Sequence, residues 1–180
     1  MKLYASLFIF LVCIISSASY GVETETNKET SSNQHVISSP VSLKFSWIPG
    51  GYFIIGDHTG SGQDDEQPLK EINIEGFWMM ATEVTRAAYA EFVHQQSYSY
   101  EKGCWVHEGV WVKRNNLDWQ NPGFVQDENH PVTCVSWDDV QAFIAWLNSQ
   151  SSYQFRLPTE AEWEFATRAG SDTIYFFGES

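Results

Sequence analysis

The sequence predicts one α+β domain with little regular secondary structure. Three observations favour this class: short runs of aromatic and β-branched residues, two or three helix signals of modest length, and no regular alternation of strand and helix patterns. Hydrophobic residues make up 43% of the 180 residues and charged residues 18%, so most of the chain is expected to bury a core.

The first eighteen residues have the pattern of a secretory signal peptide. Met1-Lys2 is a short basic start, residues 3–15 are almost continuously apolar, and residues 16–19 are small. The apolar run is shorter than the ~20 residues of a membrane span. We expect cleavage after Ala18 and export to the periplasm or the extracellular space. The alternatives are an uncleaved anchor and lipidation at Cys13, which lacks the small preceding residue of a lipoprotein.

Residues 19–42 are expected to form a flexible linker, and residues 43–180 the folded domain. The linker is polar and has no aromatic residue between Gly21 and Pro40. The whole chain has ten Lys and Arg against 23 Asp and Glu, a formal net charge of -13. That charge argues against a nucleic-acid binder and against attraction to anionic lipid.

The first strands are predicted on either side of Pro49-Gly50-Gly51. Residues 45–48 and 52–55 are aromatic and β-branched, which predicts a hairpin or a sharply bent pair of strands. The following loop contains Asp and Glu side chains suited to Ca²⁺, but the spacing is not that of an EF-hand and such loops are usually solvated. Further strands are expected over residues 72–80 and 131–137.

Two helices are predicted from capping residues and apolar periodicity. Thr85 is a suitable N-cap for a helix over residues 86–96. Ser136 and Asp139 have the spacing of a capping box, which predicts a second helix that ends near Asn148.

A third helix is predicted near the end of the chain. Thr159 and Glu162 have the same capping-box spacing, and Gly170 marks the stop after about Ala169. Four side chains of this helix are expected to be its least exposed: Ala161, Trp163, Phe165 and Ala166.

The loop between residues 97 and 130 is the candidate recognition surface. It carries Trp105, Trp111 and Trp119, interleaved with Asn, Asp and Gln side chains. Rigid aromatic rings beside polar groups suit an extended peptide or a sugar ring. The alternative is that the rings only fasten a long, irregular loop to the core.

The cysteine count favours one disulfide. Removal of a signal peptide takes away Cys13 and leaves Cys104 and Cys134, an even count in an exported protein. Such a bridge closes a loop of about 30 residues, worth roughly 3 kcal/mol. Two buried free thiols are the alternative. The sequence has no nucleophile elbow, Cys-x-x-Cys motif, phosphate loop or His spacing typical of a metal site, so no catalytic or metal-binding residue is assigned.

Six short strings follow one another in a fixed order across residues 45–178. They are Ile-Pro-Gly-Gly-Tyr-Phe-Ile-Ile-Gly at 48–56, Glu-Gln-Pro at 66–68, Glu-Val-Thr at 83–85, Tyr-Ala-Glu-Phe-Val at 89–93, His-Pro-Val-Thr-Cys-Val-Ser-Trp at 130–137 and Arg-Leu-Pro-Thr-Glu-Ala-Glu-Trp-Glu at 156–164. Together they closely resemble the N-terminal half of the formylglycine-generating enzyme, or sulfatase-modifying factor, superfamily.

This resemblance implies a variant of the C-type-lectin-like fold with a surface groove. The family reaction is the oxidation of a peptidyl cysteine in sulfatases to formylglycine, with dioxygen and a copper-binding cysteine pair. The family's copper and calcium sites lie downstream of the string at 156–164, and this sequence runs only to Ser180. The resemblance therefore implies a domain that is incomplete at its C-terminus, and we expect this chain alone to be inactive.

The resemblance also bears on the cysteines and on the last residues. Cys104 and Cys134 are similar to a structural bridge of secreted bacterial relatives. The apolar run at 174–177 is expected to be a strand without its partners, and hence an aggregation-prone edge. Its alternative is a strand that pairs with an early one in a shortened fold.

The leading hypothesis is an exported formylglycine-generating-enzyme-like domain whose partner is a sulfatase or another exported polypeptide. In it, this chain supplies scaffold and part of the peptide groove, with Trp105, Trp111 and Trp119 as lining residues. One rival is a non-catalytic module that binds peptide or glycan with the same loop. Another is an accessory domain of a non-haem iron enzyme, which needs a His-rich helical segment that the residues before Phe45 lack.

Overall fold

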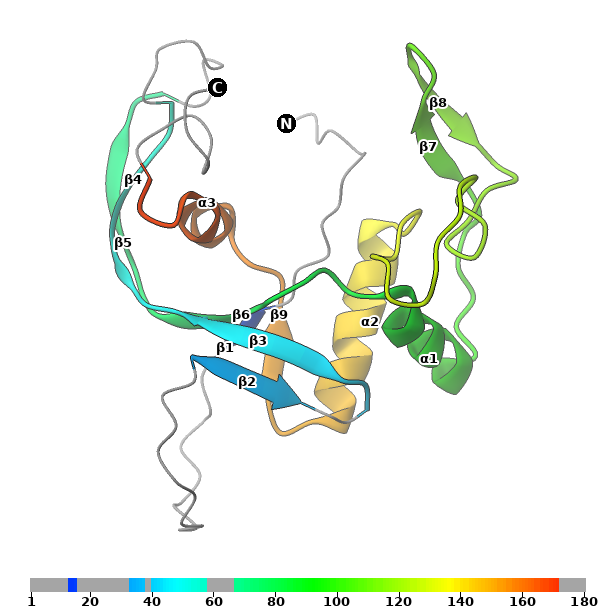
Figure 1. Cartoon of the computed structure of the whole chain (residues 1–180), viewed down its shortest axis with the longest axis horizontal. Coiled ribbons are helices and arrows are strands. Elements are labelled where there is room, and N and C mark those ends of the chain that lie inside the picture. The colour runs from blue at the N-terminus through cyan, green and yellow to red at the C-terminus, as the bar shows by residue number, and fades with distance from the viewer. Residues whose placement is uncertain (1–12, 16–32, 38–39, 58–66, 172–180) are drawn as a thin grey trace.

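The computed structural model describes residues 13–15, 33–37, 40–57 and 67–171. Figure 1 shows a central sheet beside helices α1 and α2, a curved two-stranded ribbon that leaves one end of the sheet, and a separate hairpin on the far side of α1 and α2. This mixture of short strands and few helices confirms the predicted α+β class. Within the described residues, no helix combines the length and the apolar composition needed to cross a bilayer.

Five antiparallel strands form the central sheet, in the order β2-β3-β6-β1-β9. Their bounds are Cys13–Ile15 for β1, Gln34–Ile37 for β2, Leu43–Ile48 for β3, Phe77–Met80 for β6 and Gln154–Arg156 for β9. Strand β1 comes from the predicted signal peptide and β2 from the predicted linker. The β structure therefore begins earlier in the chain than the expected domain boundary at residue 43.

The chain bends at Pro49-Gly50 from one sheet into another. Strand β3 pairs with β2 and β6, whereas β4 (Gly51–Ile55) pairs with β5 (Lys70–Ile74) in the curved ribbon. Of the two predicted alternatives, a hairpin and a sharply bent pair of strands, the bent pair is the one that forms. A Cβ on Gly50 would lie 2.6 Å from the backbone nitrogen of Gly76, so only glycine fits this close crossing. The predicted strand over 72–80 is likewise divided between the two sheets, at Glu75-Gly76.

The three predicted helices are confirmed. Their bounds are Arg86–Gln96 for α1, Trp137–Gln150 for α2 and Glu160–Arg168 for α3, with Thr85, Ser136 and Thr159 as N-caps. The capping boxes of α2 and α3 both form.

The strand predicted over 131–137 is wrong. That segment makes one isolated bridge, between Thr85 and Pro131, and the Val132 N–H donates to the Val84 carbonyl at 2.9 Å. Cys134 has a left-handed backbone, with φ of 59°, which ends any extended run before α2 begins.

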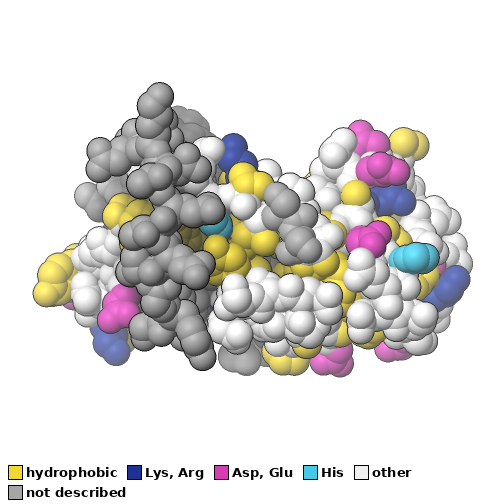
Figure 2. Space-filling model, turned by 90° about the horizontal axis from the view of Figure 1, so that it is seen from below, with side chains coloured by type: hydrophobic (Ala, Val, Ile, Leu, Met, Phe, Trp, Pro, Cys, Tyr) yellow, Lys and Arg dark blue, Asp and Glu magenta, His cyan; other side chains and the backbone are white. Residues whose placement is uncertain are grey.

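Aromatic rings on facing sides of α1 and α2 form the centre of the main core. Tyr89 and Phe92 of α1 meet Phe143 and Trp146 of α2, with ring centroids 5.6 to 6.1 Å apart between the two helices. All four side chains are buried. On the face drawn in Figure 2, hydrophobic side chains gather towards the middle of the molecule, and the acidic and basic side chains lie mostly near its periphery.

A second, smaller cluster, centred on Ile74 of β5 and on Phe77 and Met79 of β6, packs α3 against both the ribbon and the central sheet. Ala161, Phe165 and Ala166 pack against it, and the ring of Phe165 lies 5.7 Å from that of Phe53. Trp163 is 41% exposed, so the prediction that it is among the least exposed residues of the helix is wrong. At about 100° per residue, Trp163 projects from the side of α3 opposite to Ala161 and Phe165.

The carboxylate of Glu162 connects strand β9 with the start of α3. It accepts from Arg156 Nη1 at 2.6 Å and Nη2 at 2.5 Å, and also from the Thr159 N–H at 2.8 Å. The hydrogen bonds from Arg156 lower the pKa of Glu162, and those from Thr159 act in the same direction. One side chain thus serves both the helix cap and the link to the sheet.

Two expectations concern residues outside the described ranges. The calcium-type loop falls largely on residues 58–66, and the apolar run falls on residues 174–177.

Candidate functional site

A cavity of about 1110 Å³ lies between the hairpin of β7 and β8 and the loop that precedes α2. Strand β7 (Cys104–His107) pairs antiparallel with β8 (Trp111–Arg114). This hairpin lies within the loop of residues 97–130, for which the sequence analysis predicted no regular secondary structure. Its signal in the sequence is weak, because each strand has only four residues and both contain charged or polar side chains.

Four aromatic side chains form the rim of the cavity. Trp105 and Trp111 come from the hairpin, Phe124 from the loop after it, and Trp137 from the first turn of α2. Each ring is 48% to 58% exposed. Rings left half in water on a monomer are typical of a surface that binds a partner, because covering them is favourable.

The register of the hairpin explains why two of the predicted tryptophans share the rim. Trp105 lies opposite Lys113, and His107 lies opposite Trp111, so these four side chains point to one face of the hairpin. The rings of His107 and Trp111 lie 5.0 Å apart. Trp105 and Trp111 therefore lie on the same face of the hairpin, and both line the cavity.

Trp119 lies elsewhere and corrects that expectation. It is 5% exposed, its ring lies 5.3 Å from that of Tyr89, and it does not line the cavity. For this residue the alternative holds: the ring fastens the loop to the core. Phe124 and Trp137 take part in the rim although the sequence analysis did not select them. Trp137 is the last residue of the string at 130–137 and the first residue of α2. Its position at the start of a helix does not reveal the direction in which its ring points.

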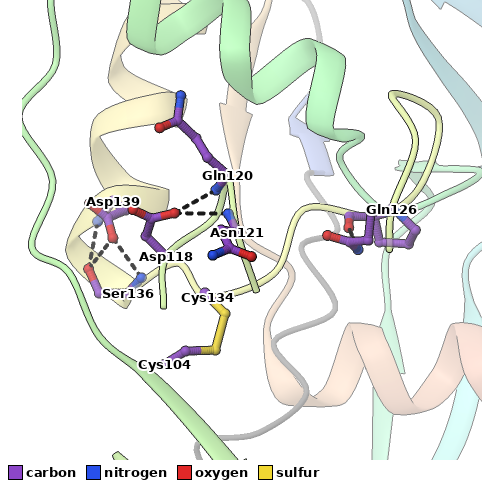
Figure 3. Close-up of a disulfide and its surroundings, with 9 residues drawn as sticks. Cys104, Asp118, Gln120, Asn121, Gln126, Cys134, Ser136 and Asp139 are labelled. Atoms are coloured by element: carbon purple, nitrogen blue, oxygen red, sulfur yellow. Dashed lines mark hydrogen bonds between the residues drawn. A yellow bond between two sulfur atoms is a disulfide. The ribbon is translucent and has the colours of Figure 1, made fainter. Parts of the chain in front are cut away.

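The predicted disulfide between Cys104 and Cys134 is present, with Cα atoms 4.9 Å apart. Figure 3 shows it with the residues that surround it. It joins the first residue of β7 to the loop before α2, and both cysteines line the cavity. The covalent bond therefore fixes the two walls of the cavity relative to each other.

The buried carboxylate of Asp118 shapes the turn that directs Trp119 inward. Its Oδ1 accepts from the N–H groups of Gln120 at 3.0 Å and Asn121 at 2.9 Å, and its Oδ2 lies 3.3 Å from Lys102 Nζ. Burial favours the neutral acid, but the hydrogen bonds from Asn121, Lys102 and Gln120 outweigh it and lower the pKa of Asp118. Figure 3 labels Asp118, Gln120 and Asn121 of this turn and draws the two hydrogen bonds that Asp118 accepts.

The N-terminus of α2 is held by a hydrogen-bond network around Asp139. Its Oδ2 accepts from the Ser136 N–H and Oγ, each at 2.7 Å, and its Oδ1 accepts from the Tyr98 hydroxyl at 3.0 Å. Burial, together with the hydrogen bond to Asp139, raises the pKa of Tyr98 to about 12. Tyr98 therefore stays protonated at physiological pH and acts as a structural donor.

Within the part of the chain that the structure describes, two buried polar atoms of the cavity wall have no hydrogen-bond partner: Gln126 Oε1 and Thr133 Oγ1. Gln126 Nε2 donates to the Pro131 carbonyl at 2.8 Å, and the main-chain carbonyl of Gln126 accepts from Arg86 Nη1 at 2.6 Å. The side-chain amide is therefore held through Nε2, and its Oε1 is the atom without a partner. A buried polar atom without a partner costs about 1–3 kcal/mol, which a ligand that donates an N–H would relieve.

The described residues do not fit the copper and calcium that the resemblance implies. Copper in this family needs thiolates, and the sulfur atoms of Cys104 and Cys134 are bonded to each other. Across the described ranges, no three His, Cys, Asp or Glu side chains are placed to share a metal ion. No chemical step through either metal is assigned to these residues.

Comparisons with known proteins identify the family. Residues 32–180 match the model of the sulfatase-modifying factor enzyme 1-like domain. The formylglycine-generating enzyme of Mus musculus is 31% identical over 76% of this chain and 43% of its own length. The inactive C-alpha-formylglycine-generating enzyme 2 of Bos taurus is 30% identical over 68% of this chain and 48% of its own length.

Among solved structures, PvdO from Pseudomonas aeruginosa has a TM-score of 0.64 at 23% identity, over 79% of this chain and 54% of its own. At that identity the likeness shows a common fold. The chain spans less than half the length of both curated relatives. On the family match over residues 32–180, the chain belongs to the sulfatase-modifying factor enzyme 1-like domain family.

Proposed function

We propose that this chain is exported and supplies the scaffold and the polypeptide-binding part of a formylglycine-generating domain. The fold is a C-type-lectin-like variant, and the cysteines that carry the oxidation belong to a part of the domain beyond residue 180. The observation that carries the proposal is the cavity, with its aromatic rim and its unpaired buried acceptors. The names of the relatives favour this function over the two rival hypotheses.

The size and lining of the cavity suit an extended polypeptide. Small-molecule sites measure roughly 300–1,000 Å³, and this cavity is larger, at about 1110 Å³. The backbone N–H groups of an extended segment are donors for Gln126 Oε1 and Thr133 Oγ1, and its side chains cover the rings of Trp105 and Trp111. The partner is therefore a sulfatase or another exported polypeptide that presents an unfolded segment around a cysteine.

We expect this chain alone to bind such a segment but not to oxidise it. The two described cysteines in the family match are held in a disulfide, so neither offers a free thiol for the reaction. Both an enzyme and a relative named inactive match two thirds or more of this chain. That supports a division in which these residues bind and a further part of the domain carries the chemistry.

Binding is tested with a fluorescein-labelled peptide that spans the modified cysteine of a sulfatase. Anisotropy titration of the exported chain gives the affinity, and the variants Trp105→Ala and Trp111→Ala are expected to weaken it about 10-fold or more, since aromatic anchors carry much of a binding energy. Tyr52→Ala is the matched control, because Tyr52 is a 78% exposed aromatic residue on β4, away from the cavity.

The same variants separate binding from folding. Trp105→Ala and Trp111→Ala should leave thermal unfolding nearly unchanged, because half-exposed rings contribute little to stability. An equal loss of affinity in Tyr52→Ala, or no binding by the unaltered chain, would contradict the proposed groove. Mass spectrometry of the peptide after incubation with copper and dioxygen should show no formylglycine, and turnover by this chain would overturn the expected inactivity.

A further inference from the structure

The hairpin of β7 and β8 makes its polar contacts within its own segment. The Gly103 N–H donates to the Leu117 carbonyl at 2.9 Å, which closes the base of the hairpin. Within the described ranges, every hydrogen bond and ion pair of residues 103–117 has its partner between residues 101 and 117. Neither hydrophobic cluster of the described core contains a residue of this segment. The hairpin, which Figure 1 shows standing apart from the sheet, is therefore held to the body neither by the core nor by polar contacts of its own.

The two chain segments that lead into the hairpin are fixed to the body just before its base. Trp119 is buried, and its ring lies 6.0 Å from that of Tyr100. Lys102 Nζ lies 3.3 Å from Asp118 Oδ2. The next residue along the chain is Gly103, with φ of 133°, a conformation that favours glycine. A glycine at this point leaves the base of the hairpin free to change direction.

The disulfide is the covalent link from the hairpin to the opposite wall of the cavity. Cys104 and Cys134 are both partly exposed and both line the cavity. The wall that carries Cys134 belongs to the body, because Val132 is buried and donates its N–H to the Val84 carbonyl, and Ser136 caps α2. The bridge therefore joins a weakly held hairpin to a firmly held loop.

The backbone of Cys134 has a conformation that favours a change once the bridge is broken. Its φ of 59° is left-handed, which is unfavourable for a residue with a Cβ. Such a conformation persists only where the surrounding contacts hold it. The bond to Cys104 is one of those contacts, so its loss releases the loop before α2 as well as the hairpin.

The chemistry that breaks the bridge is thiol–disulfide exchange. A partly exposed disulfide is open to attack by a thiolate, whereas a fully buried one is shielded. A dithiol of the Cys-x-x-Cys class supplies two electrons and two protons in two steps. The Sγ–Sγ bond breaks, both cysteines become thiols, and the dithiol becomes a disulfide.

We propose that the bridge between Cys104 and Cys134 is a redox switch of the cavity. In the oxidised state it holds the two tryptophans of the hairpin at a fixed distance from the rings of the opposite wall. In the reduced state the hairpin changes direction and the affinity for polypeptide falls, because ordering two loose walls opposes association. This inference rests on the proposed function, since it concerns polypeptide binding in the same cavity.

The test uses the exported chain with Cys13→Ser, so that only the two cysteines of the bridge contribute thiols. Mixtures of reduced and oxidised dithiothreitol set the redox state, and trapping with N-ethylmaleimide followed by intact mass gives the reduced fraction. Anisotropy measures affinity for the fluorescein-labelled sulfatase peptide with serine in place of its cysteine, which keeps the peptide out of the exchange. Hydrogen–deuterium exchange of β7 and β8 follows the hairpin without any peptide.

We expect reduction to weaken peptide binding about 10-fold or more and to speed exchange in β7 and β8 by a similar factor, while α1 and α2 keep their protection. Both changes should follow the reduced fraction and reverse on reoxidation. The double variant Cys104→Ser/Cys134→Ser should bind weakly in every mixture. Tyr52→Ala is the matched control and should respond as the unaltered chain does.

The two readouts separate failure of the switch from failure of the proposed function. Undiminished binding by the reduced chain, or unchanged exchange in β7 and β8, overturns the switch alone. So does a bridge that is reduced only after urea has unfolded the chain, or exchange that rises equally in α1 and α2. Absence of binding by the oxidised chain overturns both the switch and the proposed function.

Discussion

Two groups of aromatic residues in this molecule have opposite surroundings. Between α1 and α2, Tyr89, Phe92 and Phe143 are buried against one another, with ring centroids 5.4 to 6.1 Å apart. Around the cavity, Trp105 and Trp111 are about half exposed. Composition alone does not distinguish the two groups, although the chain contains eight Trp, eight Tyr and 12 Phe.

The difference assigns the two groups different tasks. Rings in the core stabilise the fold through burial and ring packing. Rings on the rim gain that burial only when a partner covers them. Variants in the core should therefore change the free energy of unfolding, and variants on the rim should change affinity.

The largest effect on stability is expected from Phe92→Ala. The ring of Phe92 is buried and packs on those of Tyr98 and Trp146 as well as on its neighbours in the core. Its loss should lower the free energy of unfolding by about 3–5 kcal/mol, measured by urea denaturation. Val125→Ala is the control, because Val125 is almost fully exposed. If the folded Phe92→Ala protein bound the peptide more weakly, the claim that core residues affect stability and rim residues affect affinity would be contradicted.

The next effect is expected from removing the disulfide. The double variant Cys104→Ser/Cys134→Ser should lose about 3–4 kcal/mol, because the bridge closes a loop of sequence separation 30. Hydrogen exchange should quicken first in β7 and β8, while the amides of α1 and α2 keep most of their protection. Equal loss of protection in the helices would mean that the cavity wall and the core are one cooperative unit.

A smaller effect is expected from Asp118→Asn, at about 1–2 kcal/mol near neutral pH, because hydrogen bonds to a charged acceptor are lost. Since the folded state lowers the pKa of Asp118, its contribution is fully present above the unfolded value of about 3.9 and is lost as the pH falls through the folded pKa. Urea denaturation at several pH values should show wild type and variant converge in acid. A constant difference across that range would contradict the role of the charge.

The sequence was informative where structure depends on neighbouring residues. The helices follow from Thr85, Ser136 and Thr159, whose side chains cap them as predicted. The order of short strings gave the family, and the pairing of Cys104 with Cys134 also formed as expected.

The sequence was uninformative where structure depends on distant contacts. The residues around Pro49-Gly50 can close a hairpin or separate two sheets. The close crossing with Gly76, which lies in another segment, decides between the two. The burial of Trp119 and the exposure of Trp163 likewise depend on which element packs beside each ring. In the site, the side chain of Gln126 donates to the Pro131 carbonyl and its main-chain carbonyl accepts from Arg86, contacts that no local pattern reveals.

Glu162 joins the start of α3 to strand β9 of the central sheet. The ribbon with α3 and the sheet with β9 are coupled through one carboxylate, which both ends of the connection share. Because Arg156 keeps that carboxylate ionised to a lower pH than an ordinary glutamate, the coupling survives mild acidity. A single acidic side chain thus keeps both the first turn of α3 and its link to β9 in place as the pH falls.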